Sequence, residues 1–125
     1  MIAGTGIDII EVGRIAKAME KPAFLTKVFT PAERAYLEGR AMSAQSAAGM
    51  FAAKEAMSKA LGTGFAGIGW QELEVRHDEA GRPLAALHNR AAERLAAIGG
   101  ERVHISISHS REYAVAQAIA EGRPC

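Results

Sequence analysis

The chain has 125 residues, of which 49% are hydrophobic and 23% charged, and its formal net charge is +1. A chain of this length buries one modest core, so we expect a single domain spanning residues 1–125. The near-neutral charge argues against a nucleic-acid-binding protein. Cys125 is the only cysteine, which excludes an intrachain disulfide framework and a cysteine-based zinc site and fits a reducing compartment.

The amino-terminal residues do not have the features of a signal peptide. Residues 1–10 are apolar, but they include Asp8 and are not preceded by a basic leader. The sequence also lacks a run of about 18 uninterrupted apolar residues, the length that a membrane-spanning helix requires. We therefore expect a soluble, cytoplasmic protein with no membrane association.

The first predicted elements are a short strand over residues 2–10 and an amphipathic helix after it. Glycines at positions 4 and 6 of the strand permit another backbone to approach closely. In the helix, Arg14, Lys17 and Lys21 recur at a spacing that places them along one flank. This basic flank is either a solvated helix surface or a docking surface for an acidic partner.

The rest of the chain predicts further helices and two pairs of strands. Thr30, Pro31 and Glu33 form a capping signature at the start of a helix that ends near Gly39. Alanine-rich residues 43–61 have high helix propensity, and Gly62 stands where a glycine ends a helix. The later predicted elements are hairpin strands over 73–77 and 83–87, a helix over 89–98, and strands over 103–108 and 113–120.

Two carboxylates are candidates for metal binding. Asp8 lies within an otherwise apolar strand, where an ionised carboxylate needs a cation, donors or water nearby; an exposed, inert carboxylate is the alternative. Glu55 shares a helix face with Phe51, Ser58 and Lys59, and taken alone it reads as an ordinary ion pair with Lys59. If Asp8 and Glu55 met, they could share Mg²⁺, which prefers oxygen ligands.

Two other motifs permit both a functional and a structural interpretation. Residues 62–67, GTGFAG, follow a helix, whereas a dinucleotide-binding glycine motif follows a strand, so a helix stop and turn is favoured over phosphate binding. In residues 104–110, HISISHS, alternation directs His104, Ser106 and Ser108 to one face of a strand, toward solvent or a ligand. A serine hydrolase is disfavoured because the nucleophile-elbow pattern is absent.

Four stretches in this order resemble the holo-acyl-carrier-protein synthase family of 4′-phosphopantetheinyl transferases: GTGIDIIEVGRI, FAAKEAMSKALGTGF, DEAGRP and VHISISHSREYA. The resemblance runs through nearly the whole chain. It implies an α+β fold with a long helix on an antiparallel sheet, assembled as a homotrimer with active sites between subunits. It also implies transfer of phosphopantetheine from coenzyme A to a serine of apo acyl carrier protein, with release of adenosine 3′,5′-bisphosphate, in support of fatty acid biosynthesis.

The resemblance also assigns roles to individual residues. Asp8 and Glu55 are the implied Mg²⁺ ligands and, with Lys59, the implied catalytic residues. Arg14, with Lys17 and Lys21, would bind the acidic carrier protein. The implied coenzyme A contacts are Lys54, Ser58, Gly62, Thr63, Gly64, Pro83 and His104.

At one position the chain departs from the family pattern. Met50 stands where the family more often has arginine, which removes one expected phosphate contact. Arg40 or a cation of another subunit could replace it, or coenzyme A could bind more weakly. Two competing functions are a non-catalytic carrier-binding module and a Mg²⁺-dependent hydrolase of coenzyme A or another nucleotide.

Overall fold

A computed structural model describes residues 1–124 and places five helices, one short 3₁₀ helix and five strands along them. Cys125 lies outside the described residues. The elements are β1 (Ile2–Glu11), α1 (Val12–Ala18), α2 (Pro22–Val28), α3 (Pro31–Glu38), α4 (Ala44–Ala60), η1 (Trp70–Glu72), β2 (Leu73–His77), β3 (Pro83–Leu87), α5 (Asn89–Ala97), β4 (Gly100–His109) and β5 (Tyr113–Gly122).

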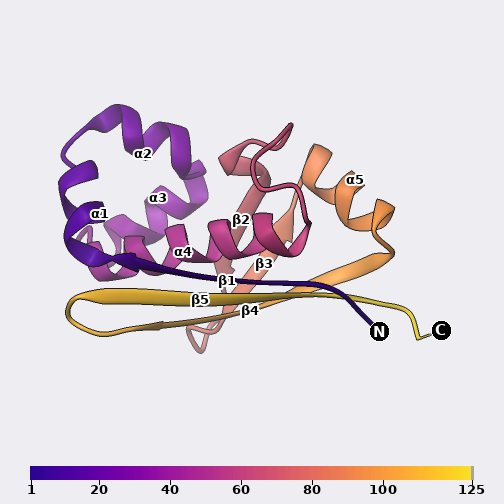
Figure 1. Ribbon diagram of the computed structural model, residues 1–125. Coiled ribbons are helices and arrows are strands. Elements are labelled where there is room, and N and C mark those ends of the chain that lie inside the picture. Colours follow the sequence, from indigo (N-terminus) through magenta and orange to yellow (C-terminus); the bar gives the residue numbers. More distant parts are fainter. Residues whose placement is uncertain (125) are drawn as a thin grey trace.

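The three long strands form an antiparallel sheet in the order β1-β5-β4, and β2 and β3 form a separate antiparallel pair. The helices lie on one side of the long sheet, with α4 running along it, and no other described element covers the opposite side (Figure 1). This arrangement confirms the predicted single-domain α+β fold with a long helix on an antiparallel sheet.

Small residues let β1 and β5 lie directly against α4. A Cβ atom added at Gly4 would lie 2.0 Å from the carbonyl oxygen of Ala60, and one at Gly6 would lie 2.0 Å from that of Ala56. The side of β5 that faces α4 carries four buried alanines, Ala114, Ala116, Ala118 and Ala120. The predicted role of the glycines, close backbone approach, is therefore confirmed.

The local signals for helix boundaries are also confirmed. The Thr30 hydroxyl accepts from the backbone N–H of Glu33, and the Glu33 carboxylate accepts from the N–H of Thr30, which completes the capping box. Ser43 caps α4 by accepting from the N–H of Ser46. Gly81 has a φ of 87° in the turn between β2 and β3, where glycine is favoured.

Two elements differ from the sequence prediction. Helix α1 ends at Ala18, and a separate helix α2 begins at Pro22, so Lys21 caps α2 and does not extend the first helix. Proline at position 22 starts a new helix more readily than it continues an old one, because it lacks a backbone N–H.

Within residues 1–124, no helix combines the length and apolarity needed to cross a membrane.

Candidate active site

Helix α4 is buried on almost every side, and one strip of it is open. Between Ala47 and Ala60, only Phe51, Glu55 and Lys59 are not buried. These residues are four apart, so they line one side of the helix. The open strip therefore carries one carboxylate and one ammonium group, while the rest of the helix belongs to the core.

Asp8 lies beside this strip. It is on β1, opposite Ala116 of β5, on the side of the sheet that faces α4. The Lys59 Nζ atom donates to the Asp8 Oδ1 atom at 3.2 Å and to the carbonyl oxygen of Ile7 at 2.9 Å. The Lys59 side chain is 51% exposed, compared with 18% for Asp8. The close β1–α4 packing thus brings together the three predicted catalytic residues.

The carboxylate of Glu55 makes no hydrogen bond or ion pair within residues 1–124. Burial raises the pKa of Glu55, and the nearby Asp8 carboxylate raises it further, while Lys59 acts in the opposite direction. Two carboxylates that repel one another across an open strip favour either a proton or a cation between them. The site can therefore hold a positive charge in addition to that of Lys59.

The donor set fits a hard divalent cation. Among the described residues there is no cluster of three histidine, cysteine, aspartate or glutamate side chains. Mg²⁺ does not require one, because it is bound through one or two carboxylates and completes its shell with water and substrate phosphates. Asp8 and Glu55 offer only oxygen ligands, and the exposed Lys59 ammonium lies beside them.

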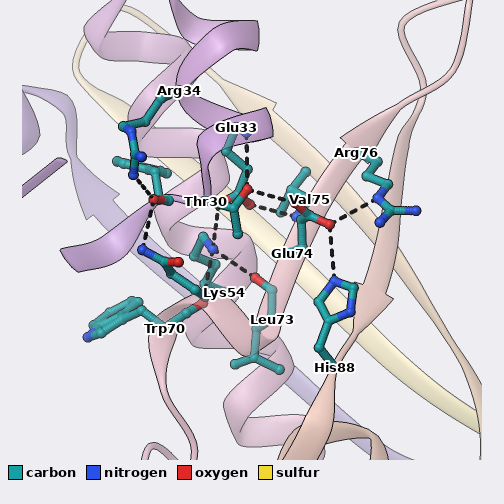
Figure 2. A network of polar contacts seen from close by, with 12 residues as sticks. Thr30, Glu33, Arg34, Lys54, Trp70, Leu73, Glu74, Val75, Arg76 and His88 are labelled. Carbon is teal, nitrogen blue, oxygen red and sulfur yellow. Dashed lines mark hydrogen bonds and ion pairs between the residues drawn. The ribbon is translucent and has the colours of Figure 1, made fainter. Parts of the chain in front are cut away.

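Lys54 and Ser58, which are predicted coenzyme A contacts, do not contribute their side chains to the open strip. The Lys54 side chain is fully buried, and its Nζ atom contacts the Glu33 carboxylate at 2.7 Å (Figure 2). Ser58 is also buried, and its hydroxyl donates to the carbonyl oxygen of Glu55 at 2.6 Å. Both side chains are committed to contacts inside the chain.

The glycine-rich segment after α4 acts here as a helix stop. The N–H of Gly62 donates to the carbonyl oxygen of Lys59, and that of Gly64 donates to the carbonyl oxygen of Ser58. Gly62 and Gly64 have φ angles of 79° and 57°. Thr63 donates through its hydroxyl to the carbonyl oxygen of Gly64. These amides close the helix, as a helix stop requires, and contact of this segment with coenzyme A stays a prediction.

Pro83 lines a small cavity of about 170 Å³ near the first turns of α4. Met50, His77 and His109 also line it, and so does Tyr36, whose ring stacks on that of His77 with centroids 3.7 Å apart. The sequence did not predict this pairing, because 41 residues separate Tyr36 and His77 and no motif connects them. The Arg40 guanidinium lies 5.0 Å from the Tyr36 ring, which brings a cation near the cavity.

His104 lies on the other side of the sheet from Asp8. Its Nε2 atom is 2.9 Å from the Glu121 Oε1 atom, on the face that no described element covers. A single chain therefore does not bring His104 to the Asp8 and Glu55 carboxylates.

The predicted carrier-binding residues are all exposed and make no ion pair in the described part of the chain: Arg14, Lys17 and Lys21.

Comparison with known proteins connects this geometry to one family. Residues 4–118 match the model of the 4′-phosphopantetheinyl transferase superfamily. A holo-[acyl-carrier-protein] synthase of Alkaliphilus metalliredigens is 52% identical over 122 residues, covering 96% of this chain and 99% of the relative. One of Koribacter versatilis is 45% identical over 124 residues, covering 97% and 99%.

Solved structures give the same result. A holo-(acyl-carrier-protein) synthase of Bacillus anthracis in complex with CoA (3′,5′-ADP) has a TM-score of 0.82 at 40% identity, covering 98% of this chain and 99% of that one. A holo-[acyl-carrier-protein] synthase of Neisseria meningitidis has a TM-score of 0.87 at 31% identity, covering 97% and 99%. The chain therefore belongs to the holo-[acyl-carrier-protein] synthase family of phosphopantetheinyl transferases.

Proposed function

We propose that this chain transfers the phosphopantetheine arm of coenzyme A to a serine of apo acyl carrier protein, with Mg²⁺ held by Asp8 and Glu55. The observation that carries the proposal is the open strip of α4, where two carboxylates and the Lys59 ammonium converge. The relatives' names and the B. anthracis complex with coenzyme A support the choice of substrates.

The reaction is a phosphoryl transfer. The serine oxygen of the carrier forms a bond to the pantetheine-side phosphorus, and the bond from that phosphorus to the oxygen of adenosine 3′,5′-bisphosphate breaks. The bound Mg²⁺ supplies electrostatic stabilisation of charge on the phosphate oxygens. Asp8 and Glu55 would hold the cation through their carboxylate oxygens, and Lys59 would bind the phosphates beside it.

Lys59 and Glu55 have separate tasks in this scheme. The exposed Lys59 ammonium is a compact positive charge that can move from the carbonyl oxygen of Ile7 to the leaving phosphate. Glu55, whose carboxylate makes no hydrogen bond or ion pair in the described chain, would accept the serine proton through water. A general base of this kind contributes roughly 10² to 10⁴ in rate.

The uncovered face of the long sheet supports the proposed homotrimer. Ile7 and Ile9 are 61% and 64% exposed there, although isoleucine is normally buried. On β5, Val115 pairs with Ile9 and Gln117 pairs with Ile7, and Ile119 follows two residues after Gln117. The four apolar side chains therefore form a patch that surrounds Gln117. If copies of this chain packed through this patch, His104 of one copy would lie near the Asp8 and Glu55 carboxylates of a neighbouring copy. We expect Ile9→Lys to lower the sedimentation mass from that of a trimer to that of one chain.

The assay that tests the function is intact-mass spectrometry of an apo acyl carrier protein incubated with the purified chain, Mg²⁺ and coenzyme A. We expect a gain equal to one phosphopantetheine on the carrier. A carrier that binds but gains no mass would indicate a binding module, and loss of coenzyme A without carrier would indicate a hydrolase. Supply of loaded carrier for fatty acid synthesis, and a cytoplasmic location, stay predictions.

A further inference from the structure

A buried polar network joins α4 to neighbouring elements on a side that is separate from the Glu55 and Lys59 side chains (Figure 2). At its centre the side chains of Lys54 and Glu33 are both 0% exposed. The Lys54 Nζ atom donates to the Glu33 carboxylate at 2.7 Å, to the carbonyl oxygen of Trp70 at 3.0 Å and to that of Leu73 at 2.8 Å. These contacts use all three donors of the ammonium group.

The acceptors of this network are equally engaged. The Glu33 carboxylate also accepts from the N–H of Thr30 at 2.9 Å and from the N–H of Val75 at 2.7 Å. The Thr30 hydroxyl in turn donates to the Glu74 carboxylate at 2.7 Å. The network thus joins α3, α4, η1 and β2 through directional contacts. A fully satisfied buried network fixes one arrangement of the elements that contribute to it.

Helix α4 needs directional contacts to fix its rotation. Its buried residues are mostly alanines, whose methyl groups offer few projections that would lock the helix against rotation or sliding. Lys54 immediately precedes Glu55, and neighbouring helix residues point about 100° apart. A rotation of α4 that breaks the Lys54 contacts therefore also turns Glu55 away from Asp8.

The same contacts hold the segment that follows the site. Trp70 begins η1 and Leu73, the first residue of β2, follows it directly, and residues 61–69 connect the end of α4 to η1. Lys54 is in the middle of α4, so its bonds to those two carbonyl oxygens close the loop back onto the helix. The position of this loop next to Lys59 then depends on Lys54.

We propose that Lys54 is a positioning residue: its buried bonds to Glu33, Trp70 and Leu73 set the rotation of α4 and thereby the distance between Glu55 and Asp8. The inference rests on the proposed function, because it assigns the consequence of that distance to Mg²⁺-dependent transfer. It gives the most buried cation of the chain a role in the geometry of the site, although that cation contacts no substrate.

The test compares Lys54→Met with Leu37→Ala, a control that weakens the fold without touching the network. Leu37 is fully buried on α3, one turn after Glu33. Glu33→Gln is a second variant, because the glutamine amide keeps one oxygen acceptor but carries no charge. All proteins are assayed at a temperature where circular dichroism shows them folded, with the rate measured against Mg²⁺ and against carrier concentration.

We expect Lys54→Met to lower kcat by about 10-fold to 100-fold and to raise the Mg²⁺ concentration for half-maximal rate by a similar factor. The KM for the carrier should stay within about twofold, because the exposed cations of α1 are untouched. Glu33→Gln should change the same two quantities in the same direction. Leu37→Ala should leave them near the values of the unmodified chain. Equal effects of Lys54→Met and Leu37→Ala would overturn the proposal.

A second measurement does not depend on activity. Hydrogen exchange followed by mass spectrometry should show faster exchange in residues 62–73 of Lys54→Met, and unchanged exchange there in Leu37→Ala. If the unmodified chain transferred nothing, the proposed function would fail, and the exchange data would still decide whether Lys54 holds the loop. Unchanged exchange in Lys54→Met would refute the proposal that Lys54 holds residues 62–73 in place.

Discussion

The contact between β1 and α4 can be tested by adding one methyl group, in the variant Gly6→Ala. The new Cβ atom would lie 2.0 Å from the carbonyl oxygen of Ala56, 2.8 Å from the backbone nitrogen of Ala60 and 2.9 Å from the Lys59 Cβ atom. The first two neighbours are backbone atoms of a buried helix, which cannot turn aside as a flexible side chain would. The strand and the helix must therefore separate.

The size of the displacement follows from the contact distance. Ordinary van der Waals contact begins at 3.4 Å, so the 2.0 Å approach to the Ala56 oxygen requires a shift of about 1.4 Å. Overpacking of this kind costs about 1 to 3 kcal/mol of stability. Asp8 is two residues from Gly6 on the same strand and moves with it. A misplacement of about 1 Å in a catalytic group can reduce the rate about 10²-fold.

The assay measures both quantities on the same protein. Urea denaturation gives the free energy of unfolding, and intact-mass spectrometry gives the rate of carrier modification at saturating Mg²⁺. Gly13→Ala is the matched control, because a Cβ atom there meets nothing within 4 Å. We expect that control to keep the rate of the unmodified chain. A Gly6→Ala protein that is folded and retains more than about half of that rate would refute the reasoning.

Further predictions concern the charged groups. Asp8→Asn and Glu55→Gln should each reduce Mg²⁺-dependent transfer by about 10²-fold or more while the circular dichroism spectrum is retained; near-normal rates in both would contradict the metal site. Burial raises the pKa of Glu55 above 4.5, so its ionised form destabilises the folded chain once the pH exceeds that value. Glu55→Gln should therefore raise the free energy of unfolding at pH 7, and this gain should be absent well below pH 4.5; urea titrations at both pH values check it. Reversing the charges of Arg14 and Lys17 to glutamate should raise the KM for the carrier about tenfold, equivalent to 1.4 kcal/mol, with kcat unchanged. Arg90→Glu, on α5 at the other end of the molecule, should leave the KM as it is (Figure 1).

Much of the fold was predictable because its signals are local. A capping box at Thr30, a serine cap at Ser43 and a glycine after residue 61 each act within a few residues, so periodicity and capping locate α3 and α4. The break between α1 and α2 was missed, since a continuous apolar spacing concealed the effect of Pro22. The order of the three long strands depends on packing between distant segments and had no local signal.

The candidate site was predictable only in part. The sequence identified Asp8, Glu55 and Lys59, but spacing alone left Glu55 as an ordinary ion-pair partner of Lys59. In the structure Lys59 contacts Asp8 instead. The buried ion pair of Lys54 was not predicted, because its partner Glu33 lies 21 positions earlier on another helix. Periodicity gives the face of a helix, and tertiary packing decides which face is open.

The alanines of β5 have a consequence for engineering. Each contributes one methyl group to the helix–sheet contact, which is worth roughly 0.8 kcal/mol of transfer free energy, about a third of what a larger aliphatic side chain provides. Enlarging any of them would move α4 away from the sheet, as a methyl group at Gly6 would. Substitutions that raise the melting temperature are therefore to be sought away from this layer, for example at exposed helix positions.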